Sequence, residues 1–163
     1  MKLHDLTRRK ATEGDRRLLF EIQKRSMREH VLAAFGSFDE KKQWEMFFRV
    51  PPQEHELLVD EFAAIGFWVV YRTVDQIELA RIAILPGFQG VGIGSSLIRE
   101  LTCEASSNSI PVRLRVFKTN PARKLYRLLG FEEERRSKYH IHMIFQNERV
   151  KKRRSRIPRM PLR

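Results

Sequence analysis

The chain contains few of the features that mark secreted or membrane proteins. Its single cysteine, Cys103, excludes an internal disulfide, so nothing in its composition indicates an oxidising compartment. The N-terminal segment MKLHDLTRRKATEGD has no apolar run of the kind that forms a secretory signal. No stretch approaches the roughly 20 apolar residues that a membrane helix needs. We therefore expect a cytoplasmic protein that does not contact membranes.

Positive charge is in excess, and it is unevenly distributed. The formal net charge is +12 over 163 residues, and eight Lys and Arg residues without any acid fall within 149–163. Residues 1–148 therefore carry a net charge of only +4. We expect residues 1–148 to form one domain and residues 149–163 to be a basic C-terminal tail. The tail leaves open a nucleic-acid-binding or ribosome-associated module, although it has no motif that reads bases and predicts nonspecific contact at most.

Strand-like and helix-like patterns alternate along the rest of the chain, and no internal repeat is present. Helices are expected from Thr12 to Gly36, from Phe38 to the Pro51-Pro52 pair, from Ile93 onward, and from Asn120 to Gly130. The expected strands are residues 3–10, 55–62, 65–73, 76–85, 112–117, 131–136 and 138–145. This order of elements predicts an α/β domain.

Glycine is concentrated in one short stretch, because four of the chain's eight glycines lie within residues 87–94. This stretch joins the strand at 76–85 to an amphipathic helix. Such a unit directs consecutive backbone N–H groups toward one point, and with the helix N-terminus they form a phosphate site. A tight turn alone would need one or two glycines. Three at alternate positions, Gly90, Gly92 and Gly94, favour the phosphate site.

Two common phosphate-binding motifs do not match this stretch. A P-loop needs Lys before Ser or Thr after its last glycine, whereas Gly94 is followed by Ser95-Ser96. A dinucleotide fingerprint would use Gly90 and Gly92, but its third glycine is replaced by Ser95. That fingerprint also opens an N-terminal βαβ unit, whereas this loop lies past the middle of the chain.

A third pattern fits better. The segment from Gln89 to Gly94, QGVGIG, resembles the Q/R-x-x-G-x-G/A pyrophosphate loop of the GNAT superfamily, the acetyl-CoA-dependent N-acetyltransferases. The preceding RIAILPGFQG is similar to that family's fourth strand, and NPARKLYRLLGFEEE downstream is similar to its N-x-x-A-x-x-LY-x-x-LGF segment. The resemblance covers about residues 76–146. It implies a mixed, mostly antiparallel sheet with flanking helices, in which the strands at 76–85 and 112–117 run parallel and splay apart.

The resemblance also implies acetyl-CoA as the cosubstrate. Its pyrophosphate would lie on the glycine loop, and its pantetheine arm would enter the splayed gap and pair with backbone of the first strand. Asn120 would contact the arm, although as a helix N-cap it already has a structural explanation. The residues expected to bind the cofactor are Ile82, Ala83, Ile84, Gln89, Gly90, Val91, Gly92, Ile93, Gly94, Ser95 and Asn120.

The expected chemistry is direct attack of a primary amine on the acetyl thioester, through a tetrahedral intermediate, with the thiolate as leaving group. The reaction needs carbonyl polarisation, an acid for the thiolate and loss of a proton from the amine. The resemblance places Tyr126, from the LY-x-x-LGF segment, beside the sulfur as that acid. Asn120 and Tyr126 are one residue closer than in many relatives, and the ring could instead only pack beside Ala122 and Leu129. The acceptor, a small molecule or a peptide, stays unidentified, and the protein is expected as a monomer or homodimer.

No residue stands out as the general base. Where some relatives have glutamate, this chain has Arg81 and Arg115, and an arginine cannot accept a proton. Glu78 is the nearest strand carboxylate, but at three residues from Arg81 it is expected on the opposite face. Glu29 and His30 are further candidates, although a solvated helix face explains both. Water, or selection of the neutral amine, also satisfies the chemistry.

Three further inferences depend on residues whose placement the pattern leaves open. If Arg81 and Arg115 face the acceptor, they favour one that carries a carboxylate or a phosphate. His140 and His142 alternate on the last strand, but no third ligand accompanies them, so no metal site is expected. Because no base is evident, a CoA-binding sensor without turnover is the alternative to an enzyme.

Overall fold

The computed structural model describes residues 6–61 and 63–146. The strands are β1 (Leu6–Lys10), β2 (Glu56–Asp60), β3 (Ala63–Arg72), β4 (Ile77–Ile84), β5 (Val112–Phe117), β6 (Phe131–Arg136) and β7 (His140–Phe145). The helices are α1 (Arg16–Phe35), α2 (Glu40–Phe47), α3 (Ile93–Asn108) and α4 (Ala122–Leu128), with 3-10 turns η2 (Glu13–Asp15), η3 (Pro52–Glu54) and η4 (Pro86–Phe88). The predicted basic tail and the first residues of the expected strand at 3–10 lie outside the described residues.

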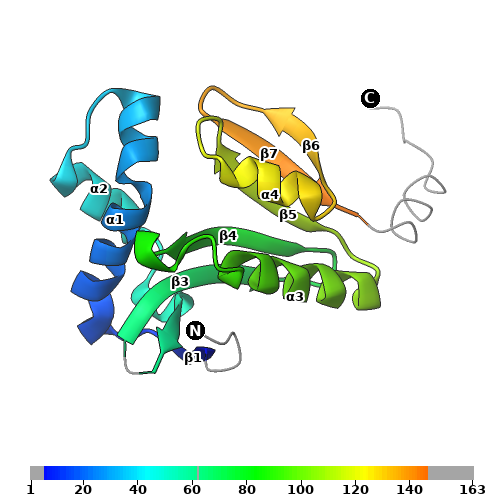
Figure 1. Ribbon diagram of the computed structural model, residues 1–163, viewed down its shortest axis with the longest axis horizontal. Helices are drawn as coiled ribbons and strands as arrows, with labels where there is room; N and C mark the ends of the chain where they lie inside the picture. The colour runs from blue at the N-terminus through cyan, green and yellow to red at the C-terminus, as the bar shows by residue number, and fades with distance from the viewer. Residues whose placement is uncertain (1–5, 62, 147–163) are drawn as a thin grey trace, which may run out of the picture.

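All the described strands form one sheet, in the order β1-β2-β3-β4-β5-β7-β6. Only the central pair, β4 and β5, runs parallel, and every other neighbouring pair is antiparallel. Figure 1 shows these two strands between the two ends of the sheet, with α3 and α4 packed beside them. The mixed, mostly antiparallel α/β fold with its parallel pair is therefore confirmed. No helix in the described part is long and apolar enough to cross a membrane.

Local signals place the helices as the sequence predicts. Before α1, the Asp15 carboxylate accepts from the backbone N–H of Thr12 at 2.8 Å, which forms half of a capping box. The helix ends at Gly36, whose φ of 74° is readily reached only without a side chain. Asp39 then caps α2 by accepting from the N–H of Lys42 at 3.1 Å.

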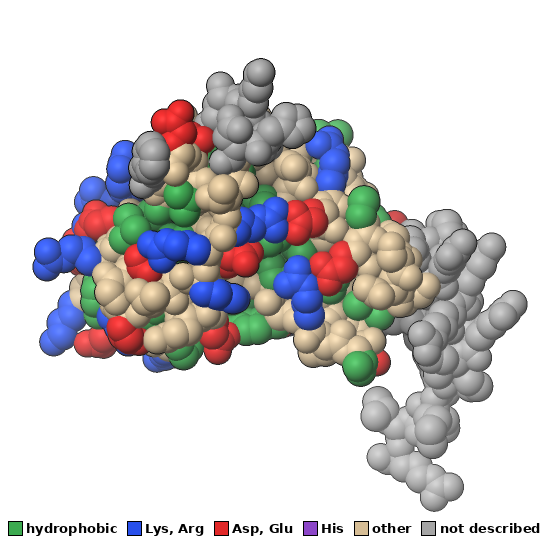
Figure 2. Space-filling model, turned by 90° about the horizontal axis from the view of Figure 1, so that it is seen from below, with side chains coloured by type: hydrophobic (Ala, Val, Ile, Leu, Met, Phe, Trp, Pro, Cys, Tyr) green, Lys and Arg blue, Asp and Glu red, His purple; other side chains and the backbone are tan. Residues whose placement is uncertain are grey.

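Most arginines of the strands are bonded to carboxylates, which fixes them on the surface. The pairs are Arg8–Glu100, Arg9–Asp15, Arg72–Glu104, Arg113–Glu134 and Arg136–Glu133. Figure 2 shows one face of the molecule on which basic and acidic side chains lie side by side. Acidic side chains lie next to many of the basic ones on this face.

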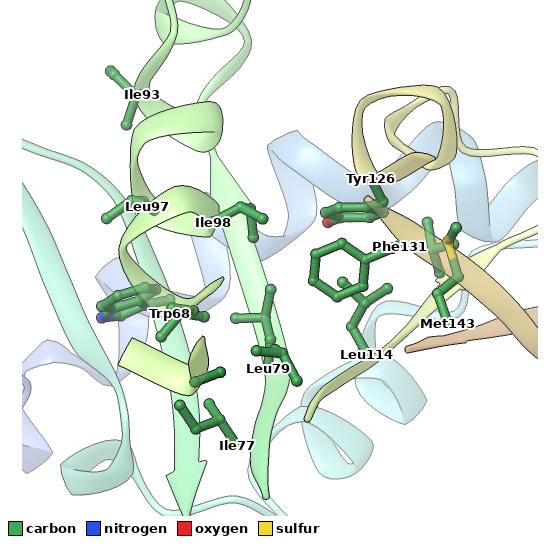
Figure 3. Close-up of a cluster of buried hydrophobic side chains, with 14 of the residues drawn as sticks. Trp68, Ile77, Leu79, Ile93, Leu97, Ile98, Leu114, Tyr126, Phe131 and Met143 are labelled. Carbon is green, nitrogen blue, oxygen red and sulfur yellow. The ribbon is translucent and has the colours of Figure 1, made fainter. Parts of the chain in front are cut away.

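The sheet separates two apolar cores. The larger lies on the α3 and α4 side, where Leu97 and Ile98 of α3 pack toward β3 and β4, as Figure 3 shows. Tyr126 and Phe131 belong to the same core on its β5 side. The smaller core lies on the α1 side, and its buried residues are Ala11, Leu19, Phe20, Ile22, Phe47, Leu57, Phe67 and Ala83.

A β-bulge interrupts the pairing of β3 with β4. Val69 is opposite Arg81, but the next residue, Val70, is opposite Leu79, so Ala80 is an extra residue on β4. A bulge of this kind leaves one residue unpaired and shifts the alternation of side chains by one position. The odd-numbered residues of β4 therefore face the α3-side core before the bulge, and the even-numbered residues face it after the bulge.

The bulge overturns the expectation for Glu78. Leu79 faces the α3-side core before the bulge, and Ile82 packs against that same core beyond it. Glu78 and Arg81 consequently both face the α1 side. The expectation that they lie on opposite faces was wrong because it assumed an uninterrupted period of two.

Candidate functional site

The two parallel strands separate halfway along their length. Their pairing consists of Ile77 with Val112, Glu78 with Arg113 and Leu79 with Leu114. Beyond Leu79, β4 stays paired with β3 while β5 stays paired with β7. Figure 1 shows the resulting divergence, with α4 beside β5 and the start of α3 beside β4. Among the described strands, the edge of β4 that faces this gap therefore has no partner from Ala80 onward.

The register shows which backbone groups face the gap. Leu85 donates its N–H to the carbonyl of Ile65 at 2.8 Å, so this pair is bonded across β4 and β3. Bonded and non-bonded pairs alternate along an antiparallel ladder. Ile82 and Ile84 therefore direct their N–H and C=O groups away from β3 and toward the gap.

The carbonyl of Ile84 joins three parts of the chain. It accepts from the hydroxyl of Ser26 on α1 at 3.0 Å and from the side-chain amide of Gln89 at 2.7 Å. The expected loop residue Gln89 thus has its side chain turned back onto β4. The N–H and C=O of Ile82 and the N–H of Ile84 are left to face the gap.

Backbone conformation explains two of the three alternate glycines. Gly90 and Gly92 have φ values of 76° and 93°, which residues with side chains rarely adopt. Gly94 has no positive φ and lies in the first turn of α3, where an added Cβ would be 3.7 Å from Ile84 Cδ1. The turn therefore does not require a glycine at position 94.

The same loop presents a row of backbone donors. The N–H of Ser96 donates to the carbonyl of Gly92 at 2.9 Å and begins the bonding of α3. Within the described residues, no acceptor is found for the N–H groups of residues 90–95. A helix leaves its first N–H groups free and carries partial positive charge there. Because the side chain of Ile93 is buried, that residue offers only its N–H.

The loop after β5 positions Tyr126. The side-chain oxygen of Asn120 accepts from the N–H of Ala122, the first residue of α4, at 2.9 Å, and so satisfies one free donor of that helix although Pro121 is the residue at its N-cap. The Tyr126 ring is 7% exposed and packs 5.8 Å from the ring of Phe131, measured between centroids. In Figure 3 it points from α4 toward Ile98 of α3, across the space between the two halves of the core.

The Tyr126 hydroxyl makes no hydrogen bond to any residue in the described ranges 6–61 and 63–146. Burial raises the pKa of its phenol to about 12. The shorter spacing from Asn120 thus does not turn the ring into solvent.

Arg81 is held on the α1 side of the sheet by contacts that the sequence did not predict. Its Nη1 donates to the carbonyl of Phe47 at 2.8 Å and lies 3.3 Å from Nε2 of His55. Its guanidinium also lies 4.5 Å from the centroid of the Phe47 ring. Nδ1 of His55 is 3.0 Å from the carbonyl of Pro51, so Nδ1 carries the proton and Nε2 accepts.

Both members of this contact are affected by burial. His55 has no exposed surface, and desolvation lowers its pKa to about 4, so the ring is neutral near pH 7. Desolvation also lowers the pKa of Arg81 to about 10, and the nearby charge of Arg115 adds to that effect. No periodic signal in the sequence marks His55, because the contact joins residues 26 positions apart.

Gly66 is a further residue that sequence reasoning missed. It lies in β3 opposite Ile84, where an added Cβ would approach the carbonyl of Ala83 to 2.5 Å. Any side chain there would displace the end of β4 that borders the gap. Its close approach to β4 depends on the three-dimensional pairing, and the sequence marks it only as an isolated glycine within a strand.

The remaining candidates contribute less. Glu29 is exposed on α1, and His30 beside it is half-buried. His140 and His142 lie on β7 and face the α1 side, because the intervening Ile141 belongs to the α3-side core. Among residues 6–61 and 63–146, no group of His, Cys, Asp and Glu side chains is arranged to hold a metal ion.

Comparison with known proteins shows which family shares this arrangement. A model of the acetyltransferase (GNAT) domain matches residues 53–133. The [ribosomal protein bS18]-alanine N-acetyltransferase of Haemophilus influenzae is 35% identical over 77 residues, which are 47% of this chain and 53% of that enzyme. The chain thus matches about half the length of this curated relative.

Solved structures of the same class share the fold. The PaiA N-acetyltransferase of Thermoplasma acidophilum, in complex with coenzyme A, superposes with a TM-score of 0.68 at 19% identity and covers 87% of this chain and 99% of its own. The ribosomal-protein-S18-alanine N-acetyltransferase of Escherichia coli gives a TM-score of 0.62 at 22% identity, with 86% and 93% covered. The match over residues 53–133 identifies a GNAT acetyltransferase domain in this chain.

Proposed function

We propose that the protein transfers the acetyl group of acetyl-CoA to a primary amine. The observation that carries this proposal is the joining of two features at one end of β4. Six consecutive backbone N–H groups, those of residues 90–95, have no acceptor in the described chain. They stand beside a strand edge that lost its partner where β4 and β5 separate. A diphosphate followed by an amide-containing arm matches both features at once.

The chain's groups suit different parts of acetyl-CoA. The donors of Gly90, Val91, Gly92, Ile93, Gly94 and Ser95 would bind the pyrophosphate. The backbone of Ile82 and Ile84 would pair with the pantetheine arm. Ala83 lies between these two and has its side chain buried on the α1 side. It would therefore hold Ile82 and Ile84 in place without contacting the pantetheine arm itself. Gly94 would keep the first turn of α3 open to the ligand. Room for the ligand therefore explains a glycine at this position, where the backbone conformation does not require one.

Tyr126 is the proposed acid. As the amine nitrogen bonds to the acetyl carbon, the carbon–sulfur bond breaks and the phenol proton passes to the sulfur. With a phenol pKa of about 12 and a thiol pKa of about 8.5, complete transfer to a free thiolate would be uphill by about 5 kcal/mol. The proton must therefore move while the bond breaks. Backbone N–H groups at the edge of β4 would polarise the carbonyl.

The amine must also lose a proton. Arg81 and Arg115 stand where some relatives have a glutamate, and neither arginine can accept a proton. The bulge brings Glu78 onto the face of Arg81, so that its exposed carboxylate becomes a candidate alongside water. Either route returns the proton to solvent and leaves Tyr126 to recover its own proton from water.

The decisive experiment measures binding and turnover separately. Acetyl-CoA is titrated into the full chain by calorimetry, and release of free thiol is then followed with a panel of amines. Binding with amine-dependent thiol release supports the proposal. Binding without release by any amine would establish the alternative, a CoA sensor. Absence of binding would remove both.

A further inference from the structure

Three arginines on the strands lack the carboxylate partner that the other strand arginines have. Arg81 on β4, Arg115 on β5 and Arg135 on β6 have no carboxylate within ion-pair distance among residues 6–61 and 63–146. Glu134 precedes Arg135 in the chain, and it is bound to Arg113 at 3.1 Å. None of the three is therefore neutralised by an ion pair within the described residues, although the unpaired Glu78 shares the face of Arg81.

Strand pairing puts these side chains on one face. Arg115 is directly opposite His142 across β5 and β7, and His142 is directly opposite Arg135 across β7 and β6. Opposite residues of neighbouring strands point to the same side of a sheet. The flanking Val116 and Ile141 belong to the α3-side core, so the row projects on the α1 side. Arg81 also projects there, toward Phe47 of α2.

The electrostatic effects agree with this placement. Burial lowers the pKa of His142, and the charges of Arg135 and Arg115 lower it further. Burial and then the charge of Arg115 likewise lower the pKa of His140. Both rings are thus kept neutral near pH 7, so the arginines provide the charge.

Arg81 is oriented as an anion receptor. Both hydrogens of its Nη1 are used, on the carbonyl of Phe47 and on Nε2 of His55. Its Nε and Nη2 carry three more N–H donors, and these have no partner in the described chain. No buried side-chain nitrogen in that part of the chain lacks a partner, so these donors reach the surface. A guanidinium fixed in this way offers its planar edge to a carboxylate or phosphate.

We propose that the acceptor amine carries an anionic group, a carboxylate or a phosphate, that Arg81 and Arg115 bind on the α1 side of the gap. The proposal rests on the acetyl transfer proposed above, and it specifies the class of acceptor. The two arginines stand on β4 and β5 just beyond the last paired residues, Leu79 and Leu114. An anion held between them therefore lies beside the site of transfer. A cationic acceptor would meet uncompensated positive charge and be rejected.

The test uses four amidated peptides that share a free N-terminal amine and differ in the charge of their two central residues: Ala-Glu-Glu-Ala, Ala-phosphoSer-Gln-Ala, Ala-Gln-Gln-Ala and Ala-Lys-Lys-Ala, whose lysine ε-amines are dimethylated so that they stay charged and cannot be acetylated. Their binding to the full chain is measured by calorimetry in the presence of CoA, at low and at high salt. Thiol release from acetyl-CoA is followed in parallel. We expect the anionic peptides to bind at least about tenfold more tightly than the glutamine peptide, and the lysine peptide to bind most weakly. The first two peptides distinguish carboxylate from phosphate.

Arg115→Gln is the informative variant, because Arg115 is exposed and makes no hydrogen bond within the described chain. It should reduce the preference for anionic peptides to about twofold or less and leave binding of the glutamine peptide unchanged. Arg81→Gln should act in the same direction. Arg72→Gln is the control, because it removes the same charge from the far end of β3, where Arg72 pairs with Glu104. That variant should keep the full preference.

Two results would overturn the inference: equal binding of the lysine and glutamate peptides, or a preference that survives Arg115→Gln. These results are distinct from failure of the proposed function. If anionic peptides bind in an Arg115-dependent way but no thiol is released, the anion site stands and acetyl transfer is refuted. If thiol is released equally with all four peptides, acetyl transfer stands and the acceptor class is refuted.

Discussion

Arg81 and His55 are joined on the α1 side of the sheet, with Nη1 of the arginine 3.3 Å from Nε2 of the histidine. The histidine is completely buried, and its other nitrogen faces the carbonyl of Pro51. Only the neutral ring can accept from a guanidinium. The orientation of Arg81 therefore depends on a histidine that stays unprotonated in the folded protein.

This dependence predicts a pH effect on stability. The pKa of His55 is about 4 in the folded state, against 6.5 as its ordinary value. Above pH 6.5 the ring is neutral in both states, and its contribution is fully present. As the pH falls from 6.5 toward 4, the unfolded chain binds a proton that the folded chain does not. The free energy of unfolding should then fall by up to about 3 kcal/mol.

Urea unfolding of the parent and of His55→Gln between pH 7.5 and pH 4.5 measures this effect. Glutamine does not titrate, so the variant should lose stability less steeply as the pH falls, whatever its stability at pH 7.5. Comparing the two slopes cancels the contribution of the carboxylates. Parallel slopes would show that His55 is protonated as easily in the folded chain as in the unfolded one.

Gly66→Ala should damage the end of β4. The new Cβ would lie 2.5 Å from the Ala83 carbonyl oxygen, a backbone atom that can move only if the strand moves. We expect a loss of about 1–3 kcal/mol in unfolding free energy and weaker acetyl-CoA binding. Gly14→Ala is the control, since its Cβ would be 3.6 Å from the nearest atom. Unchanged melting temperature and affinity in Gly66→Ala would contradict the close approach of β3 to β4.

Gly94→Val should abolish acetyl-CoA binding and leave the fold intact. Position 94 has ordinary helical backbone and room for a Cβ, so the side chain would obstruct the ligand rather than the chain. Gly92→Val should also abolish binding, but its φ of 93° makes that result ambiguous because of strain. Gly87→Val, close to the loop and in open space, is the control. Calorimetry and circular dichroism on the three variants check the prediction, and full affinity in Gly94→Val would displace the pyrophosphate from this loop.

Tyr126→Phe should lower kcat by about 10²–10⁴-fold, the usual contribution of a positioned acid. Acetyl-CoA affinity and melting temperature should change little, because the hydroxyl has no hydrogen-bond partner in the described chain. Tyr71→Phe removes a hydroxyl from β3 on the other face and should keep most of the rate. Steady-state kinetics with a responsive amine provides the measurement. If Tyr126→Phe turns over like the parent, the ring only packs and the acid is elsewhere.

Much of the fold was predictable because the signals are local. The end of the first helix at Gly36 and the strand at 112–117 both appear where the pattern places them. The parallel pairing of β4 with β5 came from the resemblance, because periodicity does not reveal which strands are neighbours. The glycine loop was recognised because its residues are contiguous.

The parts of the site that were not predicted depend on contacts between distant residues. The bulge at Ala80 leaves no mark in the alternation of apolar residues, and it reverses the face assigned to Glu78 relative to Arg81. The contact of Arg81 with His55 needs β2 and β4 to be in place before it exists. Such features follow from packing of the whole chain, which a pattern of period two does not contain.

The carbonyl of Ile84 fixes the direction of any ligand that follows this edge. An oxygen of this type has two lone pairs, and the side chains of Ser26 and Gln89 occupy both. A linear molecule with several amides therefore finds two donors and one acceptor along the gap: the N–H groups of Ile82 and Ile84 and the C=O of Ile82. The donors and the acceptor are therefore not symmetric along the edge, and a ligand that runs in one direction makes different hydrogen bonds from one that runs in the opposite direction. Removing the Gln89 amide would free one lone pair and weaken that directionality.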